Sequence, residues 1–184
     1  MEKPIAKYKN SKGDTLAIWN DTDPINPRGD WDNFGSFMVK DSCPYVKAEA
    51  DCILNFYSRD ADEKLLEKAG YIFLPVYVLD HSGVSMSTKA FGCPWDSGQI
   101  GYYVVAKEKV RKEFNKKVIS SKLRQKVLDI LNSEVELYNK YLNGDVYGYT
   151  IENANGVETD SCWGYYDIKD ILEDYPEFTE ELDV

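Results

Sequence analysis

The chain has 184 residues, of which 43% are hydrophobic and 14% aromatic, so it is long enough to bury a core and too apolar to be disordered. Its formal net charge of −10 argues against nonspecific binding of the whole chain to nucleic-acid phosphates. No run approaches the roughly 18 apolar residues of a membrane-spanning helix, and the first residues lack the apolar stretch of a secretory signal. We therefore expect a cytoplasmic protein with no membrane segment and with reduced cysteines.

The first part of the chain predicts two extended segments followed by two helices. Residues 14–19 and 34–39 are extended, and the loop at 21–32 between them contains two prolines and a glycine. A helix is expected at 45–57, after Pro44. A second helix is expected at 61–69, where Asp60 could cap the first turn and Gly70 could take the left-handed conformation after the last.

The middle of the chain predicts two strong strands and a short helix. Residues 71–79 form the run with the highest β-propensity, although Pro75 requires a sheet edge or a bulge there. Residues 100–106 form a second strand that leads into a helix at 107–114.

The last part predicts a long helix, a hairpin and a short helix. Residues 121–142 repeat apolar side chains with the spacing of one helix face, and Ser120 or Ser121 could cap that helix. Strands at 146–151 and 157–163 are joined by an Asn-Ala-Asn-Gly turn, and a helix at 167–175 precedes an acidic tail. These elements predict a single α+β domain over residues 1–184, with a mainly antiparallel sheet packed by the long helix and several short helices.

Charge is unevenly distributed along the sequence. Residues 107–126 hold nine Lys or Arg against two Glu, whereas residues 129–184 hold fifteen Asp or Glu against two Lys. These runs are either two solvated surfaces or the poles of a dipolar molecule that is steered onto a partner.

Three short blocks concentrate the residue types that build sites: 80–83, 93–101 and 160–164. One interpretation is structural: a tight turn enters the strand at Ile100, Gly98 takes a positive φ, Asp96 or Ser97 bonds nearby amides, and Trp95 and Trp163 pack a turn at 161–164 against it. The other interpretation is a small pocket. Its predicted lining is Asp80, His81, Trp95, Asp96, Gln99 and Trp163.

The same blocks could supply a cysteine hydrolase. His81 is the chain's histidine and so the candidate base, with Cys93 or Cys162 as the nucleophile and Asp80, Asp96 or Asp160 as the group that orients the imidazole.

Metal and nucleotide motifs are not indicated. The four cysteines, Cys43, Cys52, Cys93 and Cys162, match no zinc-finger spacing. The acidic loop at 21–32 departs from a calcium-binding loop because Ile25 stands at its fifth position and no glutamate ends it. No phosphate-binding glycine loop occurs, so we expect no metal and no cofactor.

Six sequence blocks resemble those of a widespread family of small proteins from phages and mobile elements of Gram-positive bacteria. The blocks are 31–35, 80–83, 94–101, 107–113, 144–149 and 160–164. Residues 40–70 align least and would be an insertion. Small acidic phage proteins of this kind are often inhibitors of CRISPR nucleases or restriction enzymes, an analogy that assigns no catalytic residue.

The leading expectation is a non-enzymatic inhibitor that binds a host defence nuclease through acidic side chains. The acidic residues expected to face a basic groove are Glu173, Asp174, Glu177, Glu180, Glu181 and Asp183. The alternatives are the cysteine hydrolase, acting on a small signalling molecule or a modified partner, and a structural subunit that forms a homodimer through the apolar stripe of 121–142.

Overall fold

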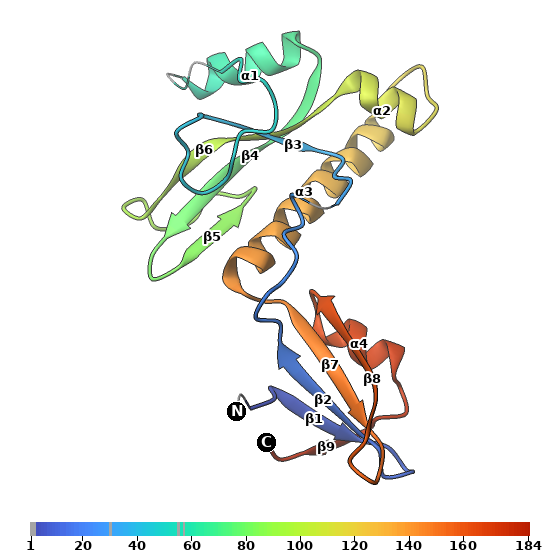
Figure 1. Ribbon diagram of the computed structural model, residues 1–184. Helices are drawn as coiled ribbons and strands as arrows, with labels where there is room; N and C mark the ends of the chain where they lie inside the picture. Colours follow the sequence, from blue (N-terminus) through green and yellow to red (C-terminus); the bar gives the residue numbers. More distant parts are fainter. Residues whose placement is uncertain (1–2, 30, 55, 57) are drawn as a thin grey trace. The chain divides into compact units, whose positions relative to one another are not determined.

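The protein has an α+β fold with antiparallel sheets, as predicted. The computed structural model describes residues 3–29, 31–54, 56 and 58–184. Its contacts group the chain into two compact units (Figure 1). We call Met1–Asp30 together with Lys140–Val184 the terminal unit, and Trp31–Asn139 the central unit. Each is described by itself.

The terminal unit is built on a five-stranded antiparallel sheet in the order β8-β7-β2-β1-β9. Its elements are β1 (Ala6–Lys9), β2 (Thr15–Asn20), β7 (Tyr147–Glu152), β8 (Glu158–Tyr165), α4 (Ile168–Asp174) and β9 (Glu180–Leu182). Leu16 and Ile18 of β2 pack with Tyr149 of β7 and with Ile171 of α4 to form the core of this unit. Helix α4 lies beside β8, and Asp167 caps it by accepting from the Lys169 amide.

The sequence did not predict β1 and β9, the two strands at one side of this sheet. β1 carries alternating lysines in only four residues, and β9 reads Glu-Glu-Leu, so neither has the apolar content of a recognisable strand. β9 pairs with β1, placing Glu181 opposite Tyr8 and Glu180 opposite Lys9. The segment expected to be an acidic tail therefore includes an ordered edge strand.

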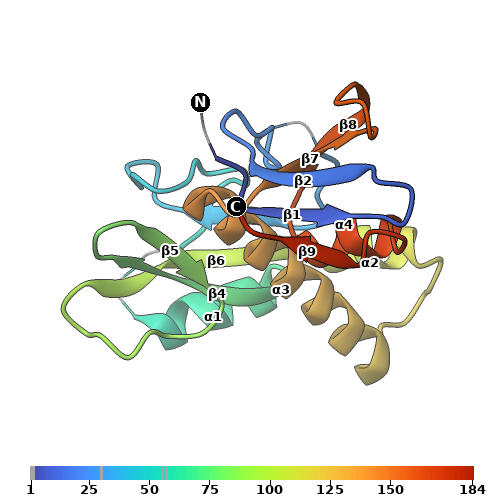
Figure 2. The same ribbon diagram turned by 90° about the horizontal axis from the view of Figure 1, so that it is seen from below.

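The central unit is built on a four-stranded antiparallel sheet in the order β3-β6-β4-β5. Its elements are β3 (Ser36–Val39), α1 (Arg59–Lys68), β4 (Tyr71–Asp80), β5 (Val84–Ser87), β6 (Ser97–Ala106), α2 (Lys107–Glu113) and α3 (Ser121–Asn143), of which residues 121–139 belong to this unit. Helix α1 lies along β4 in both views (Figures 1 and 2).

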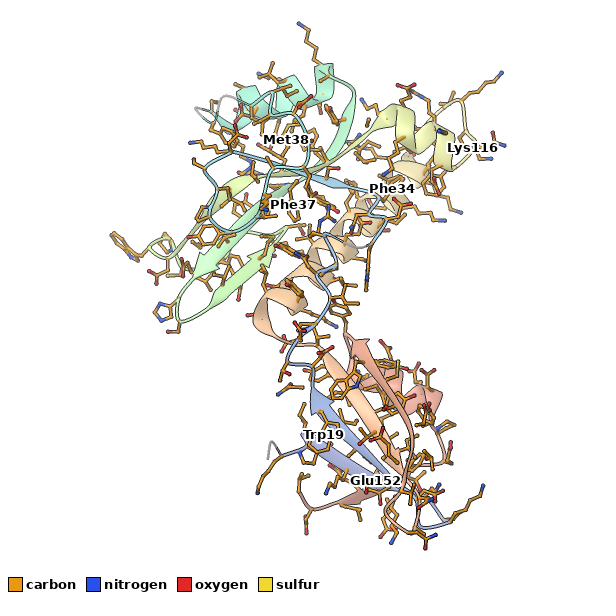
Figure 3. The ribbon with its side chains drawn as sticks, in the orientation of Figure 1. Trp19, Phe34, Phe37, Met38, Lys116 and Glu152 are labelled. Atoms are coloured by element: carbon orange, nitrogen blue, oxygen red, sulfur yellow. The ribbon has the colours of Figure 1, made fainter. Side chains whose placement is uncertain are left out.

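Both faces of the central sheet are covered, and neighbouring residues of β3 point to opposite faces (Figure 3). Met38 packs with Leu66 of α1 and with Tyr102 of β6. Phe37 packs against the tilted ring of Tyr103 on the other face and contacts Tyr138 of α3, whose ring centroid is 5.6 Å from that of Phe37. The predicted apolar stripe of the long helix is thus buried: Val127, Leu131, Val135 and Tyr138 are all inaccessible to solvent or nearly so.

Pro75 sits where the prediction required it. β4 has β6 on one side along its whole length, but β5 covers its other side only from Tyr77 onward. Pro75 therefore lies where β4 is locally an edge, and the register with β6 shifts just after it, between Val76 and Tyr77.

The predicted helix at 45–57 is wrong. The described residues of this segment are irregular, because they bond to β3 instead of to one another: the Glu49 and Ala50 amides donate to the Phe37 carbonyl, and the Glu49 carboxylate accepts from the Phe37 amide. The expected cap of the next helix is also wrong, since α1 begins after Ser58 rather than at Asp60. Gly70 does take the left-handed conformation, with φ of +81°. Among the described residues, no helix combines the length and apolarity needed to cross a bilayer.

Candidate functional site

The first two sequence blocks meet in the central unit at the tip of the β4–β5 hairpin. The loop turns at His81–Gly83, where the His81 amide donates to the Gly83 carbonyl and Ser82 takes a φ of +60°. The Asp80 amide donates to the Asp96 carbonyl at 2.8 Å, which joins this loop to the turn that precedes β6.

A thiol, an imidazole and a carboxylate converge there. The His81 Nδ1 lies 3.0 Å from the Asp96 Oδ2, and the Cys93 Sγ donates to the same oxygen at 3.6 Å. The Ser97 hydroxyl bonds to the Cys93 carbonyl and closes the turn. One candidate of each kind in the hydrolase hypothesis (the base His81, the nucleophile Cys93 and the orienting group Asp96) is thus brought together, with 70% of the His81 side chain exposed.

Beside this cluster is an open hollow with a volume of about 370 Å³. Four residues of the predicted pocket line it: Asp80, Trp95, Asp96 and Gln99. Tyr45 also lines it, and the Tyr45 hydroxyl donates to the Asp80 Oδ2 at 3.0 Å, a bond that raises the pKa of Tyr45. The sequence did not single out Tyr45, because it lies in the segment mistaken for a helix.

The third block lies in the terminal unit, on β8. There the Trp163 indole covers Gly148 of β7, where a Cβ would overlap the ring. Cys162 is on the same strand and is exposed. The packing of Trp95 with Trp163 stays a prediction, because the two residues belong to different units: Trp163 packs on Gly148 in the terminal unit, and Trp95 is 91% exposed in the central unit.

Two turn predictions within the blocks are wrong. Gly98 does not take a positive φ, because it belongs to β6 and pairs with Val78, so the turn lies earlier, at Pro94–Asp96. The Asp96 carboxylate bonds to the side chains of His81 and Cys93, and the Ser97 hydroxyl bonds to the Cys93 carbonyl, whereas it is the backbone carbonyl of Asp96 that accepts from an amide, that of Asp80. Residues 161–164 form no turn either: they continue β8, and Gly164, with φ of +91°, is the extra residue of a bulge opposite Tyr147 and Gly148.

Asp160, the first residue of the third block, has a structural role. Its Oδ2 accepts from the hydroxyls of Tyr149, at 3.1 Å, and Tyr175, at 2.6 Å. These bonds lower the pKa of Asp160, with Tyr175 the larger cause. Burial, followed by hydrogen bonding to Tyr175 and Asp160, raises the pKa of Tyr149 well above its usual value. The group links β7 and β8 to the segment after α4.

The geometry of the Cys93 cluster does not favour nucleophilic catalysis. A cysteine nucleophile needs its proton taken by an imidazole, but here the bond of the thiol goes to a carboxylate oxygen. The arrangement fits a hydrogen-bonded turn better than an activated thiol.

The six acidic residues predicted to bind a partner are all exposed in the terminal unit. Glu173 and Asp174 end α4, Glu177 precedes β9, and Glu180 and Glu181 are in β9. The Asp174 carboxylate accepts from the Tyr165 hydroxyl at 3.2 Å, and this bond together with burial, the larger cause, raises the pKa of Tyr165 to about 12.

The net charge of the chain is confined to one unit. The terminal unit has seven Lys or Arg against seventeen Asp or Glu, a net charge of −10. The central unit has fifteen of each, a net charge of zero.

The residues that the structure describes contain no cluster of three acidic, cysteine or histidine side chains able to hold a metal ion. In the acidic loop, Asp21 and Asn26 accept from the amides of Asp23 and Arg28, as turn residues do, and Asp30 lies outside the described residues.

Comparison with known proteins identified no relative: no family model, no curated protein and no solved structure matches the chain.

Proposed function

We propose that the protein is a non-enzymatic acidic inhibitor of phage or mobile-element origin that acts in the host cytoplasm. Its target would be a host defence nuclease, either a CRISPR effector or a restriction enzyme. The observation that carries the proposal is the confinement of the net charge of −10 to the terminal unit.

Ordered carboxylates suit this role. A nuclease holds its nucleic acid in a groove of Lys and Arg side chains, and an acidic surface competes for the same groove. β9 fixes the backbone of Glu180 and Glu181 against β1, so these side chains need less ordering on binding than they would on a flexible tail.

A pull-down with the tagged protein from a bacterial lysate supplemented with purified CRISPR and restriction nucleases tests the proposal. Stoichiometric recovery of one nuclease, weakened by added salt and accompanied by loss of its cleavage activity, would support it. Failure to recover or inhibit any nuclease of the set would reject those targets and shift weight to the alternative below.

The alternative is a cysteine- and histidine-dependent hydrolase acting on a small signalling molecule or a modified partner. One observation favours it: the thiol of Cys93 and the imidazole of His81 meet on the carboxylate of Asp96.

The rate of thiol alkylation distinguishes the two functions. A catalytic cysteine reacts well below pH 8.5, where ordinary thiols are protonated. We expect Cys93 to react with iodoacetamide no faster than Cys162 or the exposed Cys52 at about pH 7, measured by peptide mass spectrometry. Labelling of Cys93 at least about tenfold faster than the others, abolished by His81→Ala, would instead support the hydrolase.

A further inference from the structure

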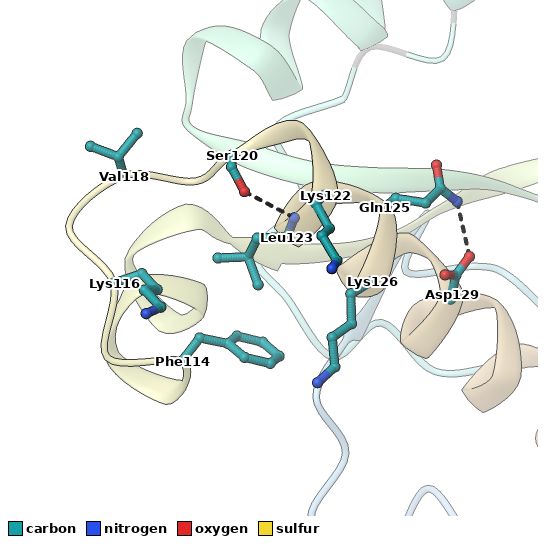
Figure 4. A pocket seen from close by; sticks show the side chains of 9 residues that line it. All are labelled: Phe114, Lys116, Val118, Ser120, Lys122, Leu123, Gln125, Lys126 and Asp129. Atoms are coloured by element: carbon teal, nitrogen blue, oxygen red, sulfur yellow. Dashed lines mark hydrogen bonds between the residues drawn. The ribbon is translucent and has the colours of Figure 1, made fainter.

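The corner between α2 and α3, in the central unit, contains a pocket that the function proposed above does not use. Its volume is about 500 Å³, within the range of roughly 300–1,000 Å³ that small-molecule sites occupy. The lining comes from the end of α2, the connecting segment and the first turns of α3 (Figure 4).

The floor of the pocket is apolar. Phe114 and Leu123 lie near one another in its lining (Figure 4), and Val118, on the connecting segment, is 78% exposed. The Phe114 ring makes an edge-to-face contact with Phe34, with ring centroids 6.0 Å apart. A flat apolar group bound here would remove exposed hydrocarbon from water without rearranging the phenylalanine.

The rim of the pocket is cationic. Lys116, Lys122 and Lys126 line it, and the sequence from residue 115 to 128 contains no Asp or Glu. Within the described part of the chain, none of these three lysines forms an ion pair, and the Lys126 Nζ lies 5.2 Å from the centroid of the Phe114 ring. The acidic side chain in the lining, Asp129, accepts from the side-chain Nε2 of Gln125 at 2.9 Å.

We infer that this pocket binds a nucleotide, either free or as part of a nucleic-acid single strand. A nucleotide carries both features that the pocket matches: a planar base for Phe114 and Leu123, and a phosphate for the lysines. The central unit, which contains the pocket, is neutral overall, and the net charge of −10 belongs to the residues of the terminal unit.

Titration of the full-length protein, followed by amide NMR shifts, tests the inference at low salt. We expect 5′-AMP to shift the amides of Val118 and Leu123, and adenosine or inorganic phosphate alone to bind at least about tenfold more weakly. Lys122→Gln should weaken AMP binding about fivefold, since it removes one charge contact. Lys112→Gln, an equal charge change on exposed α2 outside the pocket, should change it less than about twofold.

A second arm identifies the source of the nucleotide. A labelled oligothymidylate of about ten residues is titrated beside a duplex of equal length. Binding of the single strand with no response to AMP, sensitive to Lys122→Gln and not to Lys112→Gln, would place the nucleotide in a strand. Phe114→Leu should weaken either ligand through lost stacking.

Three results would overturn the inference. The first is an absence of shifts at Val118 and Leu123 with both AMP and the oligonucleotide. The second is equal weakening by Lys122→Gln and Lys112→Gln, which would mean diffuse attraction rather than a site. The third is displacement of the ligand by polyglutamate at equal charge concentration, which would indicate an acidic protein partner. Lys122 is exposed, so its variant is expected to fold.

Discussion

At the scale of single residues, the side chains that the sequence suggests as catalytic groups instead stabilise turns and strands of the backbone. The Asp96 carboxylate joins the His81 loop to the turn before β6, and the Asp160 carboxylate accepts hydrogen bonds from two tyrosine hydroxyls. Gly101 also has a structural role, in this case because it lacks a side chain: a Cβ there would overlap the Met38 carbonyl on the neighbouring strand. The density of such residues in the blocks thus reflects constrained backbone geometry.

Asp160 gives the residue-scale prediction. Because hydrogen bonds lower its pKa in the folded state, its contribution to stability is complete above the usual carboxyl pKa of 3.8 and is lost as the pH falls through the folded-state value. We expect Asp160→Asn to lower the thermal unfolding midpoint at neutral pH, and the difference from wild type to close toward about pH 2.

Asp183→Asn is the matched control, since it removes one exposed carboxylate of the same unit. It should leave the midpoint unchanged at every pH. A difference between Asp160→Asn and wild type that stays constant down to the lowest pH would contradict the assigned role of Asp160.

At the scale of elements, one carboxylate ties α3 to the sheet of the central unit. Glu134 accepts from the amides of Phe34, at 2.6 Å, and Gly35, at 2.9 Å, and from the hydroxyl of buried Tyr103, at 2.7 Å. Gly35 has no room for a Cβ beside Tyr103 and Leu131. The segment that leads into β3, at Phe34 and Gly35, is therefore attached to α3 through Glu134.

Glu134→Ala should destabilise the central unit by about 3 kcal/mol, because it leaves two amides and a buried hydroxyl without their acceptor. Glu136→Ala, at an exposed position of the same helix, should cost less than about 0.5 kcal/mol. Denaturant-dependent hydrogen exchange of the β3 and β6 amides measures both changes in the relevant unit. Equal exchange in the two variants would show that Glu134 does not anchor the strand.

The elements that could be predicted from the sequence are those with a strong local pattern. The apolar spacing of α3 and the β-branched runs of β4 and β6 specify their own structure. β1, β5 and β9 are three or four residues long and depend on a neighbouring strand, and the 45–57 segment is fixed by bonds to Phe37. Such long-range pairing leaves no periodic signal in the sequence.

The candidate site was predictable to a similar extent. The three blocks drew attention to Cys93, His81 and Asp96, which do meet. The sequence could not show that the thiol faces a carboxylate, nor that Trp163 belongs to a different unit, because both depend on the topology. It revealed the basic stretch at 107–126 but not the pocket that Phe114 and Leu123 create within it.

At the scale of the whole molecule, the main finding is that the net charge differs between the two units. The central unit is inserted between the two segments of sequence that form the terminal unit. The terminal unit combines both ends of the chain. Residues 1–30 have no net charge, so the net charge of −10 comes from residues 140–184. The basic stretch at 107–126 belongs to the neutral unit. The two surfaces can therefore be altered independently by mutation.

The central claim is tested most directly by the affinity of the captured nuclease for two charge-matched triple variants. One removes three acidic charges from the terminal unit: Glu173→Gln, Glu177→Gln and Glu181→Gln. The other removes three exposed charges from the central unit: Asp60→Asn, Glu67→Gln and Glu108→Gln.

At low salt the terminal-unit variant should bind the nuclease at least about tenfold more weakly than wild type, with a smaller dependence of affinity on salt, whereas the central-unit variant should differ by less than about twofold. If both variants bind as wild type does, or if both weaken equally, the acidic surface of the terminal unit is not what holds the nuclease.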